Sequence, residues 1–194
     1  MTADQPVGPP PDAAALHEAA LTYLARYAAT EALLRRLLNR RVDRWARLAS
    51  GDLDPDVLAG QIVVAKEAVR AVVARLAAVG AVNDVTFAEG RARSLSRSGR
   101  SRRAVVADLA ARGVNKATAR AVLTEDPDSE LAAALVLARK RRIGPFRQGN
   151  LPDIAGRRQE LAVLARAGFA QDVARRALTM DPDQAEALVM AFRR

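Results

Sequence analysis

The 194-residue chain contains no cysteine and a single histidine, His17. The lack of thiols excludes disulfide bonds and thiolate zinc sites, and one histidine is too few for a histidine-rich metal site or an ordinary catalytic triad. A glycine-rich phosphate loop and a pair of carboxylates at a spacing suited to acid–base catalysis are also missing. The sequence therefore predicts a protein that is not an enzyme and that uses no metal or cofactor.

Long hydrophobic runs are absent as well. No stretch approaches the roughly 20 apolar residues that a membrane-spanning helix needs. The first residues, MTADQPVGPPPDA, do not have the basic and then apolar order of a secretory signal. We expect a soluble, cytoplasmic protein whose residues 1–12 form a disordered, proline-rich lead.

Aromatic residues make up only 4% of the chain, and β-branched runs with a period of two are not found. Half of the residues are nevertheless apolar, most of them alanine, leucine and valine, so the chain is able to form a core. Alanine and leucine are strong helix formers, and the small alanine side chain lets helices approach closely. This composition favours an all-α fold built from short, tightly packed helices.

Acidic residues are outnumbered, with 22 Asp and Glu against 31 Lys and Arg, which gives a formal charge of +9. A basic excess of this size favours an anionic partner, such as nucleic acid, a membrane surface or an acidic protein. The same residues would also be found if arginine were abundant through compositional bias and only coated a solvated surface. Charge alone leaves both interpretations open.

Apolar spacing predicts the first helix. Its apolar residues follow the spacing i, i+4, i+7, i+8 and i+11, which places them on one helix face. They are Leu16, Ala20, Tyr23, Leu24 and Tyr27. We therefore expect both tyrosines in the core or at its edge, and not on a base-stacking surface.

Capping residues and glycines mark the limits of the next helices. Thr30 is placed to cap a second helix that runs to about residue 50. Gly80 and Gly99 are suited to end helices, because glycine tolerates the left-handed conformation common there. Either Asn83 or Asp84 is expected to cap the helix between these glycines.

A segment repeats after 55 residues: DLAARGVNKATARAVLTEDPD at 108–128 aligns with VLARAGFAQDVARRALTMDPD at 163–183. Both copies have a glycine followed by an apolar residue, a second helix, and then Asp-Pro-Asp, which indicates a duplicated helix–turn–helix unit. A weaker copy lies at 37–42, where Arg41 replaces the glycine. We interpret the chain as three tandem helical units, residues 13–82 (elongated), 83–125 and 126–194, that stack because each is too small to bury its own apolar face.

Several of these motifs, taken in order, resemble the RecX family of bacterial proteins that regulate the RecA recombinase. The middle repeat of that family resembles Asp84-x-x-Phe87-Ala88, Gly99, Val105-Val106-x-x-Leu109 and Arg112-Gly113-Val114. The family's end repeats resemble Tyr23-Leu24-Ala25-Arg26 and Leu161-x-x-Leu164-x-x-x-Gly168-Phe169. The resemblance covers about residues 18–192, and residues 43–60 look like an insertion relative to it.

The resemblance implies an elongated, curved array of three tandem three-helix repeats that binds along the RecA–DNA filament. It implies suppression of RecA ATP hydrolysis, of strand exchange and of the filament's stimulation of LexA repressor cleavage. The protein would then be a non-catalytic inhibitor of recombination, active in DNA repair and the SOS response, and a monomer. The alternative function is that of a sequence-independent DNA-binding or architectural protein.

The stretch NDVTFAEGRARSLSRSGRSRR, residues 83–103, contains most of the candidate binding residues. A helix over residues 84–98 places Phe87 and Ala88 in an apolar sector and Arg93 and Arg97 outside it. Arg91 falls inside that sector, so it must snorkel or pair with a nearby acid. The candidate filament- or nucleic-acid-binding residues are Arg93, Arg97, Arg100, Arg102, Arg103, Lys140, Arg141 and Arg142. Their side chains suit both DNA phosphates, on single or double strands, and RecA carboxylates.

Overall fold

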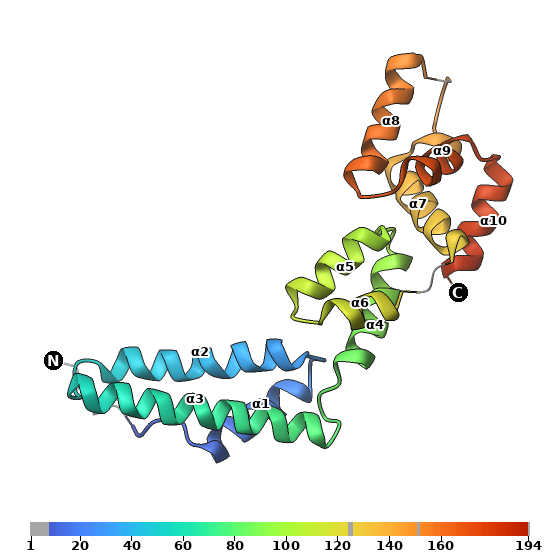
Figure 1. The fold of residues 1–194 in the computed structure, drawn as a ribbon. Helices are drawn as coiled ribbons and strands as arrows, with labels where there is room; N and C mark the ends of the chain where they lie inside the picture. Colours follow the sequence, from blue (N-terminus) through green and yellow to red (C-terminus); the bar gives the residue numbers. More distant parts are fainter. Residues whose placement is uncertain (1–7, 124–125, 151, 194) are drawn as a thin grey trace. The chain divides into compact units, whose positions relative to one another are not determined.

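The structure is a computed structural model that describes residues 8–123, 126–150 and 152–193. The described residues form helices and no strand, which confirms the expected all-α fold (Figure 1). The helices are α1 (Ala13–Leu24), α2 (Glu31–Ala49), α3 (Pro55–Ala78), α4 (Asp84–Arg97), α5 (Arg102–Ala111), α6 (Lys116–Ala121), α7 (Pro127–Arg141), the 3₁₀ helix η1 (Gly144–Phe146), α8 (Ile154–Arg166), α9 (Gln171–Thr179) and α10 (Pro182–Arg193). We call α1–α3, α4–α6 and α7–α10 the first, second and third helix groups. The predicted limits of the three repeats stay a prediction.

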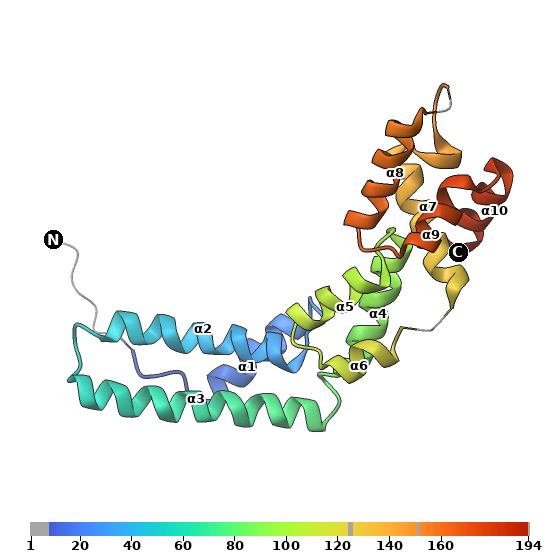
Figure 2. The same ribbon diagram turned by 45° about the horizontal axis from the view of Figure 1, so that its top comes forward.

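The chain divides into two compact units, with the boundary inside α4 after Phe87. In the first unit α2 and α3 lie side by side and antiparallel, and α1 packs against both (Figures 1 and 2). Their facing sides form one apolar core, which includes Leu16, Ala20, Leu34, Leu38, Val42, Val69, Val73 and Leu76. None of the described helices is long and apolar enough to cross a membrane.

Helix α2 begins and ends as the sequence predicts. The Thr30 hydroxyl accepts a hydrogen bond from the Leu33 N–H at 3.0 Å, and the helix runs to Ala49. Residues 37–42, the weaker copy of the duplicated unit, lie in the middle of α2 and form no turn. A turn there needs the left-handed conformation of glycine, whereas Arg41 is a good helix former and continues the helix. Residues 43–49 complete α2, and residues 55–60 begin α3.

The two tyrosines near the end of α1 differ from each other. Tyr23 is half-buried against the core of the first unit, but Tyr27 is 58% exposed, contrary to the expectation of a core position. Helix α1 ends at Leu24. The helical spacing that predicted a shared face therefore stops before it reaches Tyr27.

The start of α4 is joined to the first helix group. The Asn83 side chain caps α4 by accepting hydrogen bonds from the Val85 and Thr86 N–H groups, both at 3.0 Å. Asp84 instead accepts from the N–H of Glu31 at 2.9 Å, at the beginning of α2. Between the two predicted caps, the structure therefore selects Asn83 and gives Asp84 a tertiary contact.

The proline-rich lead is described from residue 8 onward. The indole N–H of Trp45 donates to the carbonyl of Gly8 at 2.9 Å, and Asp12 caps α1 by accepting from the Ala15 N–H at 2.8 Å. Residues 8–12 therefore have defined contacts with the first unit, unlike the disordered lead expected. The remainder of that prediction, residues 1–7, lies outside the described residues.

In the second unit α7 is the central helix, with α8, α9 and α10 around it (Figures 1 and 2). Residues 131–136 and Ala138 are all buried, so α7 is covered on every side over these turns. A helix that is apolar all round is stable only where neighbours surround it. Helix α7 is therefore the core of the third helix group.

The duplicated turns are confirmed. Gly113 and Gly168 have φ values of 88° and 91°, in the left-handed region that favours glycine. In each copy the N–H of the following apolar residue donates back into the finished helix, Val114 to the Leu109 carbonyl at 3.1 Å and Phe169 to Leu164 at 3.2 Å. Each copy is followed by a helix with an Asp-Pro start, α7 in the first case and α10 in the second. The repeat pattern thus explains why the third helix group has α10 in addition to α7, α8 and α9.

Candidate binding surface of the second unit

The turn between α4 and α5 packs directly on α7. Gly99, in this turn, is buried and has a φ of 86°. A β-carbon at this position would lie 3.0 Å from the backbone nitrogen of Leu137 and 3.2 Å from the carbonyl oxygen of Ala133. Glycine is therefore required both by the backbone conformation and by the close approach of α7.

Ser101 links the same turn to the end of α8. Its side chain is fully buried, and its hydroxyl caps α5 by accepting from the Ala104 N–H at 3.2 Å. The hydroxyl also donates to the Ala167 carbonyl at 2.6 Å. The segment that carries Arg100 and Arg102 is thus held at two points, which restricts how its arginines are presented.

The basic end of α7 lies next to this turn. The Lys140 ammonium group donates to the Ser98 carbonyl at 2.6 Å, so one of the candidate cations also ties α7 to the turn. Arg139 instead pairs with Glu186 on α10 at 3.0 Å. Arg142 ends the helix in the left-handed conformation, with a φ of 54°, and its side chain is exposed.

Helix α4 separates apolar from charged side chains as predicted. Ala88 and Ala92 are buried, whereas Arg93 and Arg97 are exposed and form no ion pair with a described carboxylate. Phe87 is only half-buried. The two exposed guanidinium groups are available to a partner.

Arg91 has an acidic partner, which is one of the two outcomes predicted from its position within the apolar sector. Its guanidinium donates two hydrogen bonds to the Asp108 carboxylate, at 2.9 and 3.1 Å, and Arg112 donates a further one at 2.9 Å. The hydrogen bonds from Arg91, supported by Arg112, lower the pKa of Asp108 to about 2 from an ordinary 3.8. The Arg91 side chain thus joins α4 to α5, and we exclude it from the binding residues.

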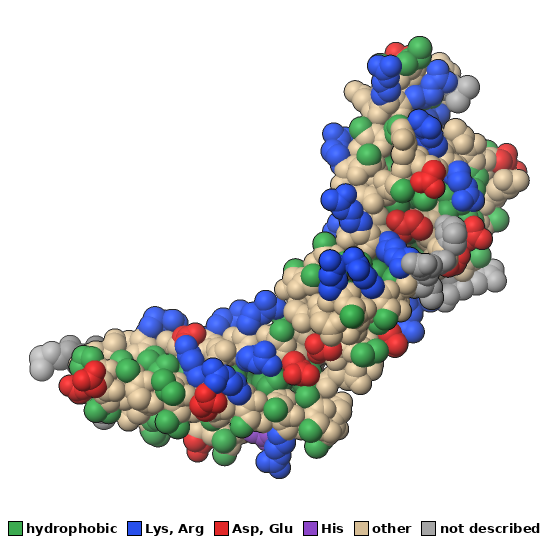
Figure 3. Space-filling view, in the orientation of Figure 1, with side chains coloured by type: hydrophobic (Ala, Val, Ile, Leu, Met, Phe, Trp, Pro, Cys, Tyr) green, Lys and Arg blue, Asp and Glu red, His purple; other side chains and the backbone are tan. Residues whose placement is uncertain are grey.

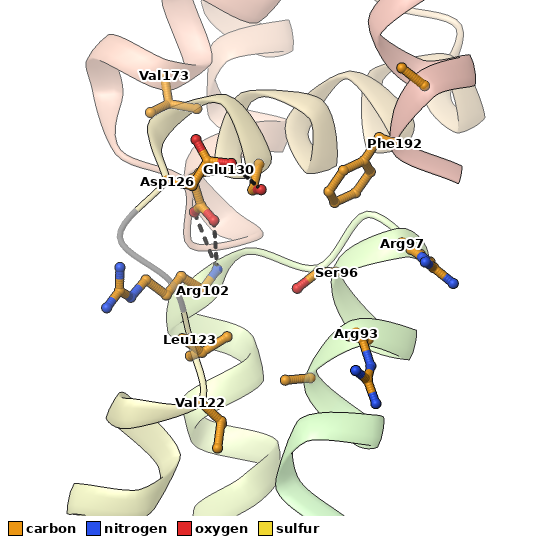
Figure 4. A pocket seen from close by; sticks show the side chains of 13 residues that line it. Arg93, Ser96, Arg97, Arg102, Val122, Leu123, Asp126, Glu130, Val173 and Phe192 are labelled. Carbon is orange, nitrogen blue, oxygen red and sulfur yellow. Dashed lines mark hydrogen bonds between the residues drawn. The ribbon is translucent and has the colours of Figure 1, made fainter. Parts of the chain in front are cut away.

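Three candidate arginines line a hollow of about 590 Å³ between the second and third helix groups (Figure 4). Arg93 and Arg97 lie near each other on α4, at the right of the view. Arg102, at the start of α5, lies apart from them at the left. Phe192 of α10 also lines the hollow, as do the acidic residues Asp126 and Glu130. This hollow therefore combines cationic, apolar and acidic groups.

The two acids of that hollow are engaged with the protein itself. The Glu130 carboxylate accepts hydrogen bonds from the Arg102 backbone N–H at 3.0 and 3.2 Å. Burial raises the pKa of Glu130, and the N–H of Arg102 opposes that rise. Asp126 caps α7 and accepts from the Ser129 hydroxyl at 2.6 Å. The carboxylates therefore stabilise helix ends and do not neutralise Arg93 or Arg97 by contact.

A second hollow, of about 620 Å³, lies around Gly99. Four cationic residues line it and no acidic residue does; the cations are Arg100, Lys140, Arg141 and Arg166. The structure thus brings together three candidates that the sequence places on separate helix groups. It adds Arg166, which sequence reasoning missed because only the fold of α8 brings it to α7. We call this site the Gly99 hollow.

The two remaining candidates line neither hollow. Arg103 is exposed on α5 beside the Gly168 turn, and Arg142 is exposed beyond the end of α7. Figure 3 shows Lys and Arg side chains spread over the visible face of the second unit. The predicted residues therefore form one group at Arg93, a second group at Arg100, and two separate cations.

Known proteins with similar sequences and folds share one family. Residues 83–123, which contain α4–α6, match the model of the second three-helix domain of RecX. A regulatory protein RecX of Myxococcus xanthus is 40% identical over 169 residues, which are 86% of this chain and 86% of that protein. A regulatory protein RecX of Agrobacterium fabrum is 37% identical over 108 residues, 56% of this chain and 57% of that protein.

A solved structure has a similar fold. The crystal structure of RecX from Lactobacillus salivarius matches with a TM-score of 0.61, covering 91% of this chain and 97% of that chain. The two sequences are 16% identical over this match, so the likeness concerns the fold alone.

Proposed function

The chain belongs to the RecX family of regulatory proteins, and from that premise we propose that it binds the RecA–DNA filament and inhibits RecA. The inhibited activities are ATP hydrolysis, strand exchange and the coprotease activity toward LexA. The protein acts by binding and carries out no catalysis. The observation that supports this proposal is that Arg93 and Arg97 of α4 and Arg100 of the following turn are exposed and form no ion pair with a described carboxylate.

The charge of this surface suits a filament of protein and DNA. Arg93, Arg97 and Arg100 are exposed and form no ion pair with a described carboxylate. Each guanidinium is a planar fork that can donate two parallel hydrogen bonds to a carboxylate or a phosphate. A RecA–DNA filament offers both groups, so the same surface is able to contact RecA and DNA.

The rigidity of the surface favours binding. Arg100 follows Gly99, which packs on α7, and precedes Ser101, which is hydrogen-bonded to Ala167. Because the backbone is already fixed, binding orders only side chains, and the entropy lost is smaller than for a free loop. The positive charge is also expected to raise the rate of association with the filament, and this increase should be largest at low salt.

Co-sedimentation with RecA filaments on single-stranded DNA tests the proposal. The variant Arg93→Ala/Arg97→Ala/Arg100→Ala is expected to bind roughly 10- to 100-fold more weakly, because it loses three exposed charge contacts. A control triple variant removes the same charge from exposed positions elsewhere in the unit: Arg120→Ala, Arg158→Ala and Arg176→Ala. The control is expected to bind within about threefold of the wild type. Equal losses in the two variants would show that net charge, and not this surface, determines binding.

A second function, sequence-independent DNA binding, is supported by the Gly99 hollow, which has four cationic and no acidic residues. In that case the protein would bind naked duplex DNA tightly at physiological salt and leave RecA activity unchanged. Filter binding across a salt series separates the two functions. Binding through several phosphates would weaken with a log–log slope of about −0.9 for each contact on duplex DNA.

A further inference from the structure

The first unit has its own hollow, which none of the candidate binding residues named above lines. It measures about 390 Å³ and lies between the end of α1 and the middle of α2. Its wall contains two tyrosines and four arginines, namely Tyr23, Tyr27, Arg26, Arg40, Arg41 and Arg44, and no acidic residue lines it. We call it the tyrosine–arginine hollow.

The two tyrosines form an aromatic wall that is open to solvent. The ring centroids of Tyr23 and Tyr27 are 5.2 Å apart, with an angle of 40° between the ring planes. Tyr23 is half-buried and fixed against the core, and Tyr27 rests beside it while remaining 58% exposed. An aromatic ring that is supported on one side and exposed on the other can stack with an unpaired base.

The arginines of α2 face this wall as a group. Arg40 and Arg44 are four residues apart, and Arg41 and Arg44 are three apart, so the three lie on neighbouring positions of one helix side. None of them forms an ion pair with a described carboxylate. The acid nearest to them in sequence, Asp43, pairs with Lys66 of α3 at 3.1 Å. Figure 3 shows Lys and Arg side chains gathered along α2.

The floor of the hollow is apolar. It is formed by Ala19, Leu37 and the buried Leu38. An apolar floor, an aromatic wall and a cationic rim together match the surfaces that bind single-stranded nucleic acid, where bases stack on rings and arginines follow the phosphates. We propose that the tyrosine–arginine hollow binds a single-stranded nucleic acid, with one base against Tyr27 and adjacent phosphates on Arg40, Arg41 and Arg44.

Single strands fit the hollow better than other anions do. A duplex keeps its bases stacked and paired, so it offers no free base face to Tyr27. An acidic protein segment would pair with the arginines, but its carboxylates would not stack on the exposed ring of Tyr27. The inference goes beyond the proposed function, because it requires neither RecA nor the basic surface of the second unit.

The test measures binding of the full chain to a fluorescein-labelled oligothymidylate of 15 nucleotides, by fluorescence anisotropy without RecA. Tyr27→Ala is expected to weaken binding about 5- to 100-fold, as loss of one stacked base does. Tyr27→Phe keeps the ring and is expected to retain the affinity within about twofold. Because Tyr27 is largely exposed, both variants should keep the wild-type circular dichroism spectrum and melting temperature.

A second pair of variants tests the phosphate contacts. Arg41→Ala/Arg44→Ala is expected to reduce the magnitude of the log–log salt slope by about 1.4, since each phosphate contact on a single strand contributes about 0.7. The matched control, Arg70→Ala/Arg75→Ala, removes the same charge from exposed positions on α3 and should leave the slope unchanged.

Three results would overturn the inference. One is equal binding by Tyr27→Ala and Tyr27→Phe, and another is binding of a 15-base-pair duplex as tight as that of the single strand. The third is competition by polyglutamate that is as strong as competition by unlabelled oligothymidylate, which would identify an acidic protein as the occupant. None of these results depends on RecA, so failure here leaves the proposed function standing.

Discussion

Replacing Asp108 by asparagine should destabilise the second unit in a pH-dependent way. Asp108 accepts hydrogen bonds from Arg91 and Arg112, and the three residues connect α4 with α5. Asparagine keeps the shape of the side chain but removes its charge. Arg91 then loses its ion-pair partner while remaining partly covered, with 33% of its side chain exposed.

The size of the effect follows from the pKa of Asp108, which the two arginines lower to about 2 from 3.8. A change of this size corresponds to about 2 kcal/mol of folding free energy. Because 28% of the Asp108 side chain is exposed, solvent screening reduces the expected loss to about 1–2 kcal/mol. The folded-state pKa lies below the unfolded value, so the stabilisation is complete well above pH 4 and is lost as pH falls toward 2. About half of it should be gone at pH 3.

Urea denaturation followed by far-UV circular dichroism, at pH 7 and at pH 3, measures the difference between the wild type and Asp108→Asn. Trp45, the single tryptophan, lies in α2 of the first unit, so its fluorescence should change little in this variant. The exposed Asp172 offers a charge-matched control, and Asp172→Asn should cost less than about 0.5 kcal/mol. A loss below about 0.3 kcal/mol at pH 7, or a loss of the same size at both pH values, would refute the reasoning.

Two further predictions concern stability. Gly99→Ala places a side chain on a residue in the left-handed conformation, with its β-carbon 3.0 Å from the backbone nitrogen of Leu137. The free energy of unfolding, measured by calorimetry, should fall by about 2 kcal/mol or more. Gly51→Ala, with no atom within 4 Å of its added β-carbon, should cost less than about 0.5 kcal/mol; comparable losses would contradict the clash. Arg147→Ala leaves Glu160, whose side chain is 13% exposed, without its cation and should cost about 3–5 kcal/mol. In urea denaturation the double variant with Glu160→Gln should recover part of that loss, and strict additivity would argue against a coupled pair.

Local features of the fold could be predicted from the sequence wherever a single residue type determines the backbone. Gly113 and Gly168 adopt the left-handed conformation that their repeated context indicates, and Thr30 caps α2. The position of Arg91 within an apolar sector likewise predicted that its side chain would snorkel or pair with an acid, and it pairs. The sequence could not identify Asp108 as that partner, because the pairing depends on how α4 and α5 pack.

The errors came from extending a pattern beyond its limits. The alignment of residues 37–42 with the duplicated turn does not extend to the backbone, because without glycine at position 41 the helix continues to Ala49. The spacing that grouped Tyr27 with the core assumed a helix that in fact ends at Leu24. Arg166 lies beside Arg100 and Lys140 only because α8 packs on α7, a tertiary contact that no local spacing reveals.

The RecA ATPase on single-stranded DNA, measured while the full chain is added, tests the central claim most directly. The account predicts a steady fall in ATP hydrolysis that is complete near stoichiometric ratios for the wild type and for the Arg120/Arg158/Arg176 control. It predicts little inhibition over the same range by Arg93→Ala/Arg97→Ala/Arg100→Ala. Unchanged ATP hydrolysis with the wild-type chain, on filaments shown to be intact, would contradict it.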